Sequence, residues 1–161
     1  EKIEQMLDTV RWSPTARNMQ PVEWIVVNDA EKVHELARMV IEWMRINDKF
    51  PAIGMAWDAG IDMIHRGAPC LIIATAHKES WAPTIDCTIA AEIFDLAAAA
   101  LGLGTCWAGF FMAAAKVHRP IIELLGLPET HRVESALMLG YSAEHYGKIP
   151  PRKESVVRWI D

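Results

Sequence analysis

One continuous apolar run near the middle of the chain limits the fold more than any other feature. Residues 68–76 read Ala-Pro-Cys-Leu-Ile-Ile-Ala-Thr-Ala, without the polar–apolar alternation of a half-exposed strand. A run of this kind is typical of a strand that is covered on both faces. The chain therefore needs further elements on both sides of a central sheet.

Helical patterns supply elements for those layers. An amphipathic helix is expected at the start, because the spacing is i, i+3, i+4, i+7 for Ile3, Met6, Leu7 and Val10. Asp29 is expected to cap a second helix with one apolar face, formed by Val33, Leu36, Ala37, Val40, Ile41 and Met44. Asp86 is expected to cap an alanine-rich helix that runs to Leu101 and stops at Gly102. Its small side chains would let another helix approach, at the centre of the fold or of a dimer.

Further strands are predicted over residues 22–28 and 133–141, with a strand or extended turn over 105–110. A helix is expected to follow to about His118, and another to start at Pro120. Residues 148–153 form an extended basic arm, and residues 155–160 could pair at a sheet edge. These patterns predict one α+β domain over residues 1–161.

The composition limits the function classes. Apolar residues make up 52% of the 161 residues, with seven Trp and eight Met, whereas about 45–50% is usual. The excess predicts a subunit interface, a cofactor pocket or both. A net charge of −5 with scattered basic residues argues against nucleic-acid binding. The longest apolar stretch, 88–104, contains Glu92 and Asp95, which argues against a membrane span.

The cysteines and histidines predict no metal site. Cys70, Cys87 and Cys106 are 17 and 19 positions apart, which fits neither a disulfide framework nor a Cys-x-x-Cys metal site. Buried structural thiols in a reducing, cytoplasmic compartment are expected instead. The six histidines show no ligand spacing.

A polar loop over residues 13–21 carries the first functional signal. Asn18 and Gln20 lie two residues apart, and Pro21 leads into the apolar run 22–27. Amide donors and acceptors beside a rigid strand suit the edge of a flat heterocycle, although an ordinary turn before a strand has a similar composition. The downstream segment 102–110, Gly-Leu-Gly-Thr-Cys-Trp-Ala-Gly-Phe, favours the first interpretation.

Other constellations are less informative. Residues 43–65 are rich in Trp and Met and could be core or an adaptable lid over an apolar substrate. Asp58 and Asp62, one helical turn apart, favour a solvated face over an acid–base pair. The sequence has no Gly-x-Ser-x-Gly, P-loop or His-Glu-x-x-His motif, and Gly102-Leu103-Gly104 follows a helix, which excludes a Rossmann fingerprint.

Four segments in this order resemble the FMN-dependent nitroreductase family: residues 14–21, the alanine-rich helix ending in Gly-Leu-Gly-Thr-Cys-Trp, the strand 136–141 and the Pro-Pro-Arg arm. Residues 14–21 resemble the family's Pro-Ser-x-x-Asn-x-Gln-Pro element, with Thr15 in place of Ser. The resemblance implies a three-layer sandwich with a mixed central sheet covered by helices. It also implies a homodimer with FMN at the interface and an exchanged C-terminal arm.

The resemblance assigns residues to three parts of the flavin. One subunit's loop would line a flavin held mainly by the other subunit, with Gln20 bracing the residues in contact: Pro14, Thr15, Ala16 and Asn18. The Ala108–Gly109 peptide would approach the isoalloxazine closely. Arg152 and Lys153 would bind the phosphate. Arg17 could be a surface charge or a phosphate contact.

The implied activity is reduction of flat acceptors, such as nitro-aromatics or quinones, by hydride transfer through FMN N5 with NAD(P)H as donor. No catalytic acid or base is assigned, because solvent can supply the protons. Two alternatives stay open: a non-catalytic flavin-binding or dimerisation module, and a flavin-linked dehalogenase or dehydrogenase.

The sequence departs from the family at its front. Members open with an Arg-Arg-Ser-x-Arg segment that holds the FMN phosphate, and nothing here matches it. Each charged hydrogen bond contributes about 1.5–3 kcal/mol, so we expect either an incomplete piece of the functional protein or weak FMN binding. Three segments are most similar to members with an upstream ferredoxin-like iron–sulfur segment: residues 65–69, 86–88 and 107–110. In such members ferredoxin-type electrons could replace NAD(P)H.

Overall fold

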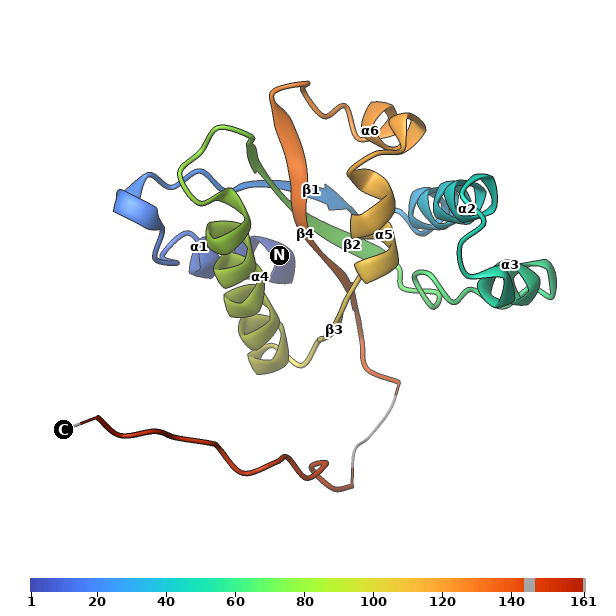
Figure 1. The fold of residues 1–161 in the computed structure, drawn as a ribbon. Coiled ribbons are helices and arrows are strands. Elements are labelled where there is room, and N and C mark those ends of the chain that lie inside the picture. Colours follow the sequence, from blue (N-terminus) through green and yellow to red (C-terminus); the bar gives the residue numbers. More distant parts are fainter. Residues whose placement is uncertain (144–146, 161) are drawn as a thin grey trace.

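The computed structural model describes residues 1–143 and 147–160, and its centre is a four-stranded sheet. The strand order is β1 (Glu23–Val27), β2 (Cys70–His77), β4 (His131–Gly140) and β3 (Gly104–Trp107) (Figure 1). All three neighbouring pairs are antiparallel. A mixed sheet would therefore need a strand from outside these pairs, such as a partner's arm, and that part of the prediction stays untested.

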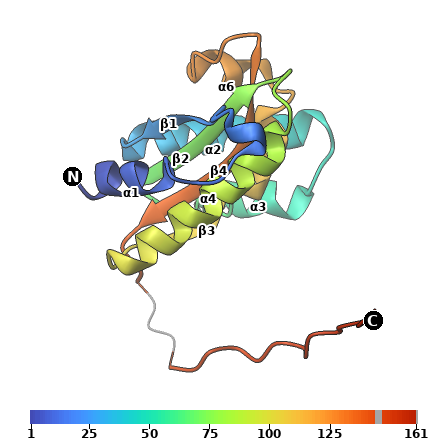
Figure 2. The same cartoon turned by 90° about the vertical axis from the view of Figure 1, so that its left-hand side faces the viewer.

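Helices form a layer on each face of the sheet, as predicted. The first layer contains α1 (Lys2–Val10) and α4 (Pro83–Ala100). The opposite layer contains α2 (Ala30–Ile46), α5 (Gly109–Ala115) and α6 (Arg119–Leu124), with α3 (Pro51–Asp58) packed against α2. Figure 2 views the molecule from the side of the first layer. The predicted three-layer α+β sandwich is confirmed.

Alternate side chains of β2 fill the two cores. Cys70 and Ile72 pack toward α1 and α4, where Phe94 is fully buried. Leu71 and Ile73 pack toward α2 and α5. Burial of both faces removes a large apolar area from water, which is the main favourable contribution to folding. The continuous apolar run thus marks the middle layer correctly.

The predicted start of α2 is confirmed, and the predicted start of α4 is wrong. Asp29 accepts hydrogen bonds from the backbone N–H groups of Glu31 and Lys32, as a helix cap does. The helix α4 instead begins at Pro83, and Asp86 lies inside its first turn. Proline is favoured at the first helical position because it has no N–H to leave unpaired there.

The stretch 43–65 is divided between core and surface. Trp43, Met44, Ile53 and Ile64 are buried, whereas Phe50, Met55, Ile61 and Met63 are exposed. The stretch therefore contributes to the core through one part of its apolar residues. Its exposed part leaves the lid interpretation open.

Asp58 and Asp62 do not share a helix face, because α3 ends at Asp58. The Asp58 carboxylate lies 2.6 Å from the Arg45 guanidinium. Asp62 accepts hydrogen bonds from the backbone N–H groups of Ile64, His65 and Gly67. Both carboxylates thus have structural roles.

Two of the three cysteines are buried, as predicted. Burial raises the pKa of Cys70 to about 11, and burial together with Glu134 and Asp86 raises the pKa of Cys87 to about 12. The prediction is wrong for Cys106, which is exposed because β3 is an edge strand. Within the described residues, no helix has the length and apolar character needed to cross a membrane.

The C-terminal arm, residues 147–160, is extended and exposed along its whole length. Figures 1 and 2 both place it apart from the sheet and helices. Residues 155–160 form no strand within one copy of the chain.

Acid is expected to destabilise the fold through His65. Its Nδ1–H donates to the Val33 carbonyl at 3.0 Å, its ring is fully buried, and its Nε2 has no partner among the described residues. Burial lowers the pKa of His65 below its usual 6.5, despite the opposing effects of Val33 and Asp62. Below about pH 6.5 the unfolded chain therefore binds a proton that the folded chain does not. The free energy of unfolding should fall by up to about 1.4 kcal/mol per pH unit.

Urea denaturation at pH 7.5, 6.0 and 5.0 measures this loss. The variant His65→Gln should flatten the pH dependence, whereas His77→Gln, which is not among the groups that shift the His65 pKa, should retain it. A second loss of folding stability is expected below pH 3.8. Burial raises the pKa of Asp62, but the three backbone N–H donors outweigh burial and lower the pKa overall. An equal slope in wild type and His65→Gln would contradict the assignment to His65.

Candidate functional site

Hydrogen bonds that involve side chains help to fix the loop that follows α1. Ser13 Oγ donates to the Val10 carbonyl at 2.5 Å. The Ala16 N–H donates to Asp86 Oδ1 at 2.9 Å, and the Gln20 N–H donates to Thr15 Oγ1 at 3.0 Å. The predicted loop residues thus lie together beside the N-terminal end of α4, and in Figure 2 the segment between α1 and β1 passes in front of that helix.

The loop has unusual backbone geometry. Arg17, Asn18 and Gln20 have φ values of 55°, 54° and 51°, in the left-handed region that non-glycine residues seldom occupy. Such conformations are concentrated at ligand sites, where the surrounding structure holds them. Asn18 and Gln20 are both exposed. Gln20 Nε2 donates to the Asn18 carbonyl at 3.4 Å within the loop, and the Asn18 side-chain amide is available to a ligand.

Arg17 has a contact within the chain. Its guanidinium lies 4.4 Å from the centre of the Trp81 ring, a cation–π arrangement. This contact supports the surface-charge alternative for Arg17, and it joins the loop to the segment before α4.

Asp86 is a site residue that the sequence interpretation missed. Its side chain is 2% exposed, and it joins the loop to α4 across 70 positions of sequence. A second buried carboxylate, Glu134, accepts hydrogen bonds from Thr84 Oγ1 at 2.7 Å and from Arg132 Nε. An acidic residue among the apolar positions of α4 was the available signal, and we interpreted it as a cap.

The Ala108–Gly109 peptide lies at the start of α5. The Ala108 N–H donates to the Ala136 carbonyl at 2.9 Å, which fixes the peptide against β4. A Cβ atom added at Gly109 would meet no atom within 4 Å. Gly109 also lines a pocket of about 390 Å³ with mainly apolar neighbours, among them Phe50, Met63, Trp107 and Phe110. The peptide therefore offers an open surface beside an apolar hollow.

A single copy of the chain does not bring the three predicted groups together. The polar loop over residues 13–21 (the Asn–Gln loop) is held by α4 on one face of the sheet. The Ala108–Gly109 peptide begins the helix α5 on the opposite face. Arg152 and Lys153 lie on the arm, where Arg152 Nη1 donates to the Pro150 carbonyl at 3.2 Å. Gly109 and the loop and arm residues Asn18, Arg152 and Lys153 are exposed, but one copy of the chain does not place the three groups around one ligand.

Apolar side chains are exposed on the α1–α4 side of the molecule. Trp12, Met19, Ile85 and Leu96 all project into solvent there. The edge strand β1 also has four apolar residues, none of which is fully buried. Several large exposed apolar side chains on one side of a molecule favour an interaction site there.

Comparison with known proteins gives one consistent result. The family model described as the nitroreductase family matches residues 1–141. A protein from Archaeoglobus fulgidus, named as an NADH dehydrogenase/NAD(P)H nitroreductase, is 30% identical over 145 residues, which are 88% of this chain and 72% of that protein.

Solved structures share the fold. A nitroreductase with bound FMN from Bacteroides fragilis superposes with a TM-score of 0.79 at 23% identity and covers 99% of this chain and 87% of its own. An FMN-dependent nitroreductase from Clostridium difficile has a TM-score of 0.67 at 26% identity, with coverages of 92% and 79%.

Proposed function

The chain belongs to the nitroreductase family, and from this we propose that two copies of it form an FMN-dependent oxidoreductase with NAD(P)H as donor. The observation that carries the proposal is the split site. Asn18, Gln20 and Gly109 are exposed, yet the loop and the Ala108–Gly109 peptide lie on opposite faces of one copy's sheet. A homodimer would place one copy's loop against the other copy's peptide.

The chemistry of these groups fits FMN. An isoalloxazine has a polar edge, which the amide of Asn18 suits while Gln20 braces the loop, and a flat apolar surface, which suits the hollow beside Gly109. The phosphate suits the guanidinium of Arg152 and the ammonium of Lys153. Pro14, Thr15 and Ala16 complete the loop that would line the ring.

When bound, FMN supplies the redox chemistry, since its N5 accepts a hydride from the donor and gives it to the acceptor. The chain's own residues would bind and orient. The loop would hold the flavin edge, and the hollow lined by Trp107 and Phe110 would exclude water above Gly109. We propose flat acceptors, nitro-aromatics or quinones, because the hollow is mainly apolar.

The surface supports the homodimer. Exposed Trp12, Met19, Ile85 and Leu96 would be covered by a second copy. The strands β1 and β3 are each paired on one side only within the described residues, so an exchanged arm has an edge to join. Obligate dimers commonly bury about 2,000–5,000 Å².

The extent of the domain and the cellular compartment are also proposals. We propose that residues 1–161 act as one FMN-binding domain, of which residues 144–146 and 161 lie outside the described part. The unpaired cysteines support a reducing, cytoplasmic compartment.

Flavin binding tests the function. Titration of FMN into the protein should quench flavin fluorescence, and the complex should oxidise NADH when a nitro-aromatic is present. The variant Gly109→Val should keep its thermal stability, because the added side chain starts in open space, while FMN affinity falls at least about tenfold as the close approach is lost.

Ala52→Val, at an exposed position of α3 outside this hollow, is the control and should bind FMN as the wild type does. If the protein is colourless after incubation with FMN and removal of the free flavin, the result would favour the non-catalytic module. Equal FMN affinity in wild type and Gly109→Val would contradict the assigned contact.

A further inference from the structure

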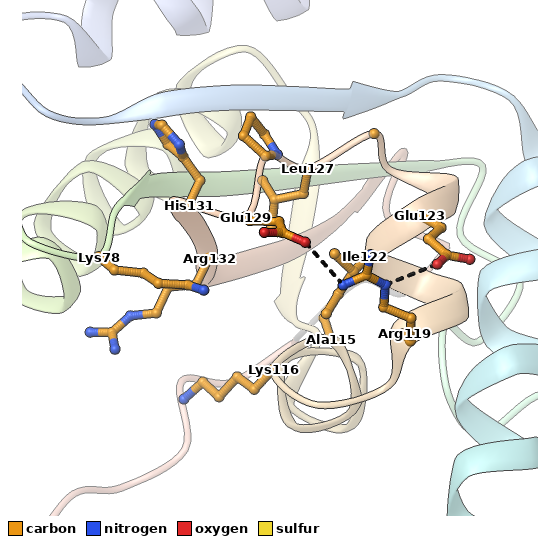
Figure 3. A pocket seen from close by; sticks show the side chains of 12 residues that line it. Lys78, Ala115, Lys116, Arg119, Ile122, Glu123, Leu127, Glu129, His131 and Arg132 are labelled. Carbon is orange, nitrogen blue, oxygen red and sulfur yellow. Dashed lines mark hydrogen bonds and ion pairs between the residues drawn. The ribbon is translucent and has the colours of Figure 1, made fainter.

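A second pocket lies away from the proposed flavin residues. Its volume is about 300 Å³, and none of the nine residues assigned to FMN lines it. Its walls come from four places: the residue after β2, the segment from α5 to α6, the turn 126–129 and the start of β4. Figure 3 shows the side chains that surround it.

Two of its four permanent cations are already paired. Arg119 Nε lies 2.9 Å from Glu123 Oε1, and its Nη1 lies 3.7 Å from Glu129 Oε1. Arg132 is bound to the buried carboxylate of Glu134. These contacts leave little charge for a ligand on either arginine.

The other two cations are Lys78 and Lys116. Neither ammonium has an ion-pair partner within residues 1–143 and 147–160, although the chain carries a net charge of −5. The Lys78 N–H donates to the Thr130 carbonyl at 2.8 Å, which fixes the backbone of that residue. In Figure 3 both lysines lie on one side of the pocket, and the Arg119 ion pairs lie on the other.

The remaining groups set the character of the pocket. His131 has its Nδ1 3.0 Å from Thr130 Oγ1 and its Nε2 3.4 Å from Glu23 Oε1. Apolar side chains also line the pocket: Ala115, Ile122, Leu127 and Pro128. Two unpaired ammonium groups beside an apolar wall suit an anion with an apolar body.

We propose that this pocket binds a small organic phosphate. Its phosphate group would lie between Lys78 and Lys116, since lysine binds phosphate as a point charge. Its apolar body would lie against Ile122 and Leu127. A volume of about 300 Å³ is at the lower end for small-molecule sites, which limits the ligand to about the size of a single ring with its phosphate.

Calorimetric titration of the full 161-residue chain tests the proposal at pH 7.5 and constant ionic strength. Phenyl phosphate is the probe, and inorganic phosphate measures the contribution of the charge alone. We expect phenyl phosphate to bind at least fivefold more tightly than inorganic phosphate. The variant Lys78→Met/Lys116→Met should weaken its binding at least tenfold.

The control variant is Lys32→Met/Lys49→Met, which removes the same number of charges at exposed positions that line neither this pocket nor the proposed flavin site. It should leave phenyl phosphate binding unchanged. Equal weakening in both double variants would overturn the site, because net charge would then explain the effect. Equal affinity for both probes, or no binding by the wild type, would also overturn it.

Discussion

Removal of residues 148–161 is expected to convert the proposed homodimer into a monomer. The arm carries Ile149, Val156, Trp159 and Ile160, and all of them are exposed in one copy of the chain, Val156 completely. Burial of one large apolar side chain contributes about 1.5–3 kcal/mol. Loss of three such contacts would therefore weaken dimerisation at least about a thousandfold.

Sedimentation velocity across a range of protein concentrations measures this change. A matched pair of variants separates the two roles of the arm. Val156→Ser/Trp159→Ser/Ile160→Ser should dissociate the dimer. Arg152→Met/Lys153→Met, a few residues earlier, should keep the dimer and weaken FMN binding.

Two outcomes would contradict this division of roles. A wild type that is monomeric at every concentration would remove the basis for the shared site. A dimer that survives deletion of the arm would move the interface to the α1–α4 side alone, where Trp12, Ile85 and Leu96 are exposed.

The layers of the fold could be predicted because their signals are local. The spacing of Val33, Leu36 and Val40 gives the buried face of α2 without reference to the rest of the chain. The uninterrupted run in β2 shows that both of its faces are covered. Periodicity reports burial directly, since each side chain's face follows from its position along the element.

The order of the strands in the sheet and the exposure of Cys106 could not be predicted from local patterns. β4 follows β3 along the chain, yet it lies between β2 and β3 in the sheet. This order leaves β3 at an edge and Cys106 exposed. Strand order depends on contacts between distant segments, and no local pattern encodes them.

In the candidate site, too, local sequence features could be predicted and contacts between distant segments could not. The resemblance identified the Asn–Gln loop and the Ala108–Gly109 peptide by their sequence. It gave no sign of the hydrogen bond between Ala16 and Asp86, whose residues are 70 positions apart. We therefore interpreted Asp86 as a helix cap, although its carboxylate points to the loop.

Replacement of Asp86 by alanine is expected to reduce FMN affinity about a hundredfold. The change removes the hydrogen-bond acceptor of the Ala16 N–H, which costs about 1–3 kcal/mol. It also removes the only hydrogen bond between the described residues 14–20 and α4. The loop holds Arg17, Asn18 and Gln20 in left-handed conformations, and ordering each freed residue again on binding would cost about 1–2 kcal/mol.

Fluorescence titration of FMN and thermal unfolding without FMN, measured on the same samples, test this role. Asp86→Asn keeps an oxygen acceptor at the same place and should recover most of the FMN affinity. Glu92→Ala, exposed on the same helix, should match the wild type in both measurements. If Asp86→Ala lowers the unfolding temperature but binds FMN normally, Asp86 stabilises α4 without positioning the loop. A loss of FMN affinity that Asp86→Asn rescues would instead identify the carboxyl oxygen as the group that holds Asn18 in place for the flavin.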